Sequence, residues 1–116
     1  MGGRGTFAIG KPVPYTYETV GFIEGIKVLK GKDGVHGLPE EAHSSSAYIS
    51  LYPNGTVKQI RVFNPDLTAK VDIEFSMHQG KLTLHAHDYA NGERKPARLL
   101  THTEQEHYKR FFGGKK

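Results

Sequence analysis

The chain has 116 residues, no cysteine and a formal net charge of +4. This length fits a single domain with a modest core, and the lack of thiols excludes disulfides, cysteine nucleophiles and zinc sites built from cysteine. No apolar run approaches the roughly 20 residues of a membrane-spanning helix, so no membrane partner is expected. A basic domain suits contact with nucleic-acid phosphates, although a charge of +4 also fits an ordinary surface.

The N-terminal third predicts a flexible arm followed by two short strands. Residues 1–14 are rich in glycine and are interpreted as that arm, ahead of one domain at 15–113 and a basic tail at 114–116. Aromatic and β-branched residues predict strands over 15–21 and 25–30. Glycines then predict a loop over 31–37, and residues 38–46 are compatible with one helical turn or with irregular structure.

The middle of the chain predicts an antiparallel hairpin. Alternation over 47–52 and 56–63 indicates two strands, and Asn54-Gly55 between them favours a tight turn. In the second of these strands, the alternation predicts one shared face made of Val57, Gln59, Arg61 and Phe63.

The next two strands carry the pattern with the most chemical content. Residues 70–76 place Asp72 and Glu74 on one face, and a turn at Gln79-Gly80 leads into a strand that closes on His85-Ala86-His87. Side chains alternate across a strand, so His85 and His87 are expected to project from the same face.

The C-terminal part predicts a loop and one helix. Residues 88–100 are interpreted as a loop, and Thr101 with Glu104 then matches a capping box. The helix is expected to reach Phe112 and to pack Tyr108, Phe111 and Phe112 against the core. The whole chain therefore predicts an α+β fold, a twisted antiparallel sheet of about four to six strands with one or two short helices on one face.

The paired histidines are compatible with two kinds of chemistry. In metal-independent RNA cleavage, one imidazole takes the proton of the 2′-hydroxyl and another protonates the leaving oxygen. Arg61 would share their open face and hold the scissile phosphate. The same imidazoles also suit a metal ion, with a third ligand from His36, His43, His78 or Asp88. A solvated pair on an exposed strand is the alternative without chemistry.

Other polar residues are candidate contacts to a substrate. Ser44 and Ser45 follow His43 and offer hydroxyls to a phosphate, although local turn bonding explains them equally well. Tyr89 follows the histidine strand and is the tyrosine expected to lie exposed near a site, where it would stack on a base. Thr101 either caps the helix or donates a hydrogen bond to a phosphate.

A set of short motifs runs from the start of the chain to Tyr89. They are Met1 to Gly5, Leu38-Pro39, His43-Ser44, Ala47-Tyr48-Ile49, Pro53-Asn54-Gly55-Thr56, Gln59-Ile60-Arg61-Val62-Phe63, Asp72-Ile73 and His85-Ala86-His87-Asp88-Tyr89. Together, over roughly residues 20–90, the chain resembles small phage-encoded proteins and the C-terminal domains of phage head-morphogenesis (MuF-type) proteins.

This resemblance implies a fold and a function. Such domains look like members of the barnase–EndoU–colicin–RelE group of toxin-like ribonucleases, a twisted antiparallel sheet packed on N-terminal helices. The resemblance implies an active site of His43, Arg61, His85 and His87, with RNA as substrate, no cofactor and a location in the host cytoplasm. It is also compatible with a non-catalytic module that binds a host protein, a nucleic acid, or a phage structural or immunity protein. A metal-binding His-x-His domain is the third hypothesis.

Overall fold

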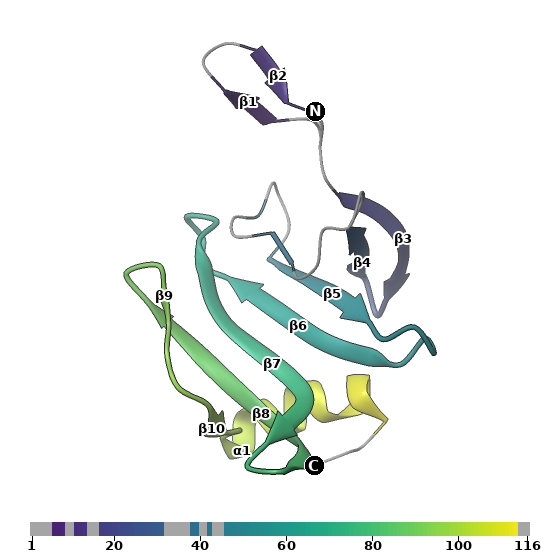
Figure 1. Cartoon of the computed structure of the whole chain (residues 1–116), viewed down its shortest axis with the longest axis vertical. Helices are drawn as coiled ribbons and strands as arrows, with labels where there is room; N and C mark the ends of the chain where they lie inside the picture. Colours follow the sequence, from purple (N-terminus) through teal and green to yellow (C-terminus); the bar gives the residue numbers. More distant parts are fainter. Residues whose placement is uncertain are drawn as a thin grey trace.

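The computed structural model describes residues 6–8, 11–13, 17–31, 38–39, 42 and 46–113 (Figure 1). Strands β1 (Thr6–Ala8) and β2 (Lys11–Val13) pair with each other as a small separate sheet. The larger sheet contains β3 (Tyr17–Ile23), β4 (Ile26–Gly31), β5 (Ala47–Leu51), β6 (Val57–Phe63), β7 (Ala69–His78), β8 (Lys81–Ala90), β9 (Glu93–Arg94) and β10 (Arg98–Leu99).

The larger sheet has eight strands and a mixed topology. Its order is β10-β8-β7-β6-β5-β4-β3, and β9 pairs with the end of β8. The α+β class is confirmed, but the expected strand number was too low, because the segment 88–100 continues β8 and forms two further short strands. The expectation of a wholly antiparallel sheet is also corrected, since β4 and β5 run parallel.

The central hairpin forms where Asn54-Gly55 predicts it. The amide of Gly55 donates to the Tyr52 carbonyl at 2.9 Å, and Gly55 has a φ of 90°, which favours glycine. A bulge at Lys58 follows, because Ser50 pairs with Gln59 and Leu51 pairs with Val57. Val57 therefore joins the core on the opposite face from Gln59 and Arg61, which corrects its predicted face.

One face of the sheet is covered by the C-terminal helical segment. Helix α1 (His102–Tyr108) continues into the short 3-10 helix η1 (Lys109–Phe112), and the two lie along the sheet (Figure 1). The predicted capping box is present, with the Thr101 hydroxyl accepting from the Glu104 amide at 3.1 Å. Among the residues that the structure describes, no helix is long and apolar enough to cross a membrane.

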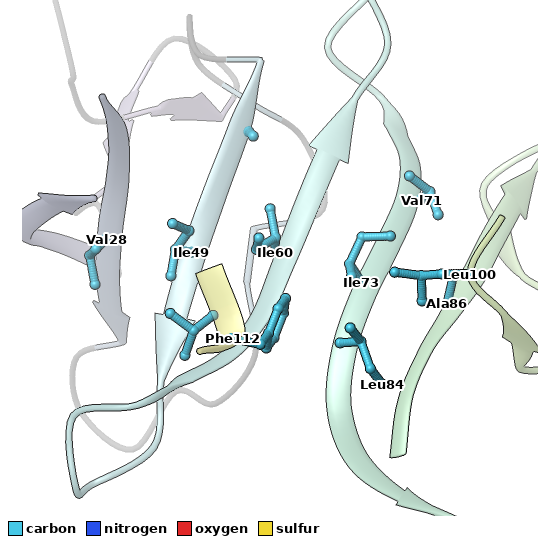
Figure 2. Packing of buried hydrophobic residues seen from close by; sticks show 11 residues of the cluster. Val28, Ile49, Ile60, Val71, Ile73, Leu84, Ala86, Leu100 and Phe112 are labelled. Atoms are coloured by element: carbon cyan, nitrogen blue, oxygen red, sulfur yellow. The ribbon is translucent and has the colours of Figure 1, made fainter. Parts of the chain in front are cut away.

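The main hydrophobic core lies between this helical segment and the sheet. Phe112, 4 % exposed, packs with aliphatic side chains from β4 to β8, and Tyr108 and Phe111 pack at its border, as predicted. Figure 2 shows Ile49, Ile60 and Ile73, each fully buried, as neighbours across three adjacent strands. The core fixes β6, β7 and β8 side by side, which positions the residues that point to the other face.

The opposite face carries a second, smaller apolar cluster. Leu38 and Ala42, from the connection between β4 and β5, pack with Leu29, Tyr48 and Phe63. Leu38 and Ala42 therefore cover one end of the face, and polar side chains occupy the adjoining part.

Candidate metal-binding site

Polar residues align in two rows across β6, β7 and β8. One row pairs Arg61 with Asp72 and Asp72 with His87. The next row pairs Gln59 with Glu74 and Glu74 with His85. Directly opposite residues in an antiparallel sheet share a face, so the structure brings Arg61, His85 and His87 to one surface, as expected.

The tight turn between β7 and β8 sets this alignment. Gln79 and Gly80 have φ angles of 52° and 82°, the positive values of a two-residue hairpin turn. Counting outward from this turn places Glu74 opposite His85 and Asp72 opposite His87. The two acidic partners were assigned to one face by alternation, and the turn is the sequence signal that identifies the histidines as their neighbours.

Arg61 is held by protein groups on this face. Its Nε and Nη2 donate to the two carboxylate oxygens of Asp72 at 2.7 and 3.0 Å. Its Nη1 donates to the carbonyls of Leu38 and Pro39 at 2.8 and 3.2 Å. Burial opposes the charge, but the Asp72 carboxylate outweighs it and raises the pKa of Arg61. The guanidinium therefore joins the β4–β5 connection to the sheet.

Tyr89 completes this buried network. Its hydroxyl donates to Asp72 Oδ2 at 2.8 Å, and the Arg61 guanidinium carbon lies 5.5 Å from its ring centroid. Burial and the hydrogen bond to Asp72 raise the pKa of Tyr89 to about 12. Tyr89 was expected to be exposed near a site, and it is near the histidines but partly buried.

Backbone carbonyls orient both histidine rings. His85 Nδ1 lies 2.9 Å from the Thr83 carbonyl oxygen, and His87 Nδ1 lies 2.9 Å from the Lys95 carbonyl oxygen. A carbonyl oxygen only accepts, so each Nδ1 carries the proton and, in the neutral ring, Nε2 bears the lone pair. The rings lie with centroids 5.1 Å apart at an angle of 76°. This is the tautomer that histidine ligands usually adopt when a carbonyl holds the second nitrogen.

Glu74 places a carboxylate beside these lone pairs. Its Oε1 lies 3.7 Å from His85 Nε2, and its Oε2 forms an ion pair with Arg94 Nη2. One ligand atom each from Glu74, His85 and His87 lies within 4.8 Å of the others. The side chains of His85 and Glu74 are 3 % and 13 % exposed, so any charge between them is largely shielded from water.

The remaining predicted site residues lie away from this cluster or outside the residues that the structure describes. His43, Ser44 and Ser45 are outside the described residues, as are His36 and the side chain of His78. Asp88 pairs with Arg98 at 2.7 Å on the core face. Thr101 caps a helix that packs on the face opposite the histidines. A pocket of about 360 Å³ lies at the far end of β8, where Lys81, Leu82 and Leu99 line it.

Comparisons with known proteins give no relative: no family model, curated protein or solved structure matches this chain. The resemblance to phage head-morphogenesis domains and toxin-like ribonucleases therefore stays a prediction.

Proposed function

We propose that this domain binds one divalent transition-metal ion through Glu74, His85 and His87. The supporting observation is the orientation of the two histidines. Both Nδ1 atoms are engaged by backbone carbonyls, and a carboxylate oxygen faces the Nε2 of one ring at 3.7 Å. At this distance a proton on Nε2 gives an ion pair with the carboxylate, and a metal ion in place of that proton would bind both groups, so the two atoms suit a shared cation.

Two imidazoles and one carboxylate suit Zn²⁺, Fe²⁺, Co²⁺ or Ni²⁺ better than Ca²⁺ or Mg²⁺, which prefer oxygen ligands. In a tetrahedral site with bonds of about 2.0–2.1 Å, ligand atoms lie about 3.3 Å apart. The candidate ligand atoms lie within 4.8 Å of one another, so binding requires them to close by about 1.5 Å or less. Because β7 is fixed by the core, the Glu74 side chain would make this movement, and its ion pair with Arg94 would weaken as it does so.

Titration of the full chain with Zn²⁺ and Co²⁺, against a competing chelator of known affinity, tests this proposal. We expect one ion per chain, and His87→Ala should weaken binding by at least about 100-fold, because it removes a direct ligand. His102→Ala is the matched control, since His102 also lies close to a glutamate, Glu106, but on the exposed surface of α1. Equal affinities for the two variants would overturn the proposal.

A Glu74→Gln variant tests the carboxylate ligand by a spectroscopic measurement as well as by affinity. It keeps the size of the side chain but removes the anionic ligand, so the Co²⁺ absorption spectrum should change along with the affinity. A folded Glu74→Gln protein with unchanged Co²⁺ affinity and spectrum would remove Glu74 from the ligand set.

RNA cleavage is the second proposal, favoured by the close approach of the two imidazole rings at 5.1 Å. The Arg61 guanidinium is committed to Asp72 and two carbonyls, so the cation for a phosphate would be the half-exposed Arg94. Cleavage in the presence of EDTA that is lost in His87→Ala supports this proposal. Cleavage abolished by EDTA favours the metal site. No cleavage of any RNA tested, together with a stable complex with a host protein or nucleic acid, would favour the binding-module hypothesis.

A further inference from the structure

Three protein ligands leave part of the coordination sphere of a metal ion open. Within the described residues, the cluster of potential ligands contains Glu74, His85 and His87 and no fourth side chain. Structural zinc sites have four protein ligands, whereas sites with three leave a position for an exogenous ligand. The chemistry beside this open position indicates what that ligand is.

Arg94 is the cation beside this position. It lies on the short strand β9, which pairs with the end of β8 and places Arg94 directly opposite Tyr89. Its Nη2 forms an ion pair with Glu74 Oε2, and its Nε lies 3.9 Å from Asp72 Oδ2. The Arg94 side chain is 42 % exposed, in contrast to 10 % for Arg61. Arg94 is therefore the arginine of this cluster that a ligand from solvent can reach.

The charge of the cluster changes when a metal ion enters. Without it, Arg61 and Arg94 balance Asp72 and Glu74. A divalent ion that takes Glu74 Oε1 as a ligand draws negative charge away from this carboxylate and weakens the ion pair that its Oε2 forms with Arg94. The loaded site then carries excess positive charge at its exposed edge, which an anion from solvent neutralises.

We propose that the metal-loaded site binds a small oxyanion, with one oxygen on the metal ion and another on the Arg94 guanidinium. Carboxylates and phosphates share this chemistry, because each presents one oxygen that can bind a metal ion and another that accepts a charge-assisted hydrogen bond from a guanidinium. This inference rests on the proposed metal function, and it specifies the class of ligand that the open position takes.

Two features of the site favour entry of the oxyanion from the side of β9. His85 is 2 % exposed, whereas His87 and Arg94 are the more accessible members. The His87 ring is fixed by the carbonyl of Lys95, the residue after Arg94, at 2.9 Å. The same short segment thus orients one ligand and carries the cation.

The test uses the full chain loaded with Co²⁺, whose visible absorption reports each change of ligand. Acetate, inorganic phosphate and chloride are added in separate titrations at constant ionic strength. We expect saturable spectral changes with acetate, with phosphate or with both, which identifies the oxyanion, and little change with chloride. Arg94→Gln should weaken oxyanion binding at least about tenfold, the effect of one charge-assisted hydrogen bond. Its Co²⁺ affinity should be equal or higher, because Glu74 is released.

Arg110→Gln is the matched control. Arg110 is also an exposed arginine with a glutamate partner, since its Nε lies 2.8 Å from Glu24 Oε1, and it belongs to η1, which packs on the face of the sheet opposite the cluster. It removes the same charge and should leave oxyanion binding unchanged. Failure to bind Co²⁺ would overturn the metal function itself. Co²⁺ binding with no oxyanion response, with an equal response to chloride, or with equal oxyanion affinity in Arg94→Gln and Arg110→Gln would overturn the oxyanion site alone.

Discussion

Arg61 and Asp72 face each other on β6 and β7 and form a two-point ion pair at 2.7 and 3.0 Å. Their side chains are 10 % and 0 % exposed, and Tyr89 donates a third hydrogen bond to the same carboxylate. The pair lies beside the proposed ligands, since Asp72 is directly opposite His87, and it ties Leu38 and Pro39 to the sheet through their carbonyls. It therefore links the stability of the fold to the position of the site.

Removal of the Asp72 charge should destabilise the fold strongly. Asp72→Asn leaves the Arg61 guanidinium buried without its counter-ion, and breaking a buried pair in this way costs about 3–5 kcal/mol. The measurement is the free energy of unfolding in urea. Glu93→Gln, which removes an exposed ion pair with Lys95, is the control and should cost less than about 1 kcal/mol. Equal losses in the two variants would contradict the buried-pair interpretation.

Arg98 should make the free energy of unfolding depend on pH in the acidic range. Its guanidinium bonds to Asp88 on β8 and Glu104 on α1, and these bonds lower the pKa of both carboxyls from ordinary values of 3.8 and 4.5. A lowered pKa in the folded state gives stability that is present at neutral pH and is lost as the pH falls below those values. Unfolding free energies from pH 6 to pH 2.5 should fall less steeply for Arg98→Gln than for the wild type. Parallel curves would show that Arg98 is not the cause.

Tyr89 should resist ionisation. Burial, reinforced by its hydrogen bond to Asp72, raises its pKa to about 12, so the folded protein favours the neutral phenol. A raised pKa gives stability that is present below pH 10, the ordinary value, and is lost as the pH rises toward 12. The ultraviolet absorbance of tyrosinate should show a late component in the wild type that Tyr89→Phe lacks. Its persistence in Tyr89→Phe would assign it to another tyrosine.

Metal binding should stabilise the folded chain. An ion present at 100 times its dissociation constant adds about 2.7 kcal/mol to the free energy of unfolding, provided that the unfolded chain binds it weakly. Zn²⁺ should therefore raise the midpoint temperature of thermal unfolding, and EDTA should reverse this shift. In Glu74→Gln, Zn²⁺ should leave the midpoint unchanged. Glu106→Gln, which changes the exposed glutamate beside His102, should respond as the wild type does. A shift in Glu74→Gln as large as that of the wild type would place the ion elsewhere.

Local patterns in the sequence predicted the elements that depend on neighbouring residues. The Asn54-Gly55 turn, the capping box of Thr101 and Glu104, and the shared face of the two histidines are confirmed. Each depends on backbone preferences or alternation within a few residues. The pairing of Glu74 with His85 could also have been predicted from the sequence, because the Gln79-Gly80 turn fixes the register.

The sequence did not predict features that depend on distant contacts. Neighbouring residues do not encode the parallel pairing of β4 with β5, since the strands are joined by a long connection. Alternation placed Arg61 on the open face, but it could not indicate that two carbonyls from that connection engage the guanidinium. The bulge at Lys58 reversed the face of Val57, because one extra residue shifts the alternation.

The parallel contact between β4 and β5 has a consequence for local unfolding. It consists of two register pairs, Lys27 with Tyr48 and Val28 with Ile49, while β7 and β8 share eight. The β3–β4 hairpin is thus attached to the sheet by a short ladder and can detach as a unit while the other strands stay paired. Backbone amides in 17–31 should exchange with deuterium sooner than those of β7 and β8, which carry the proposed ligands.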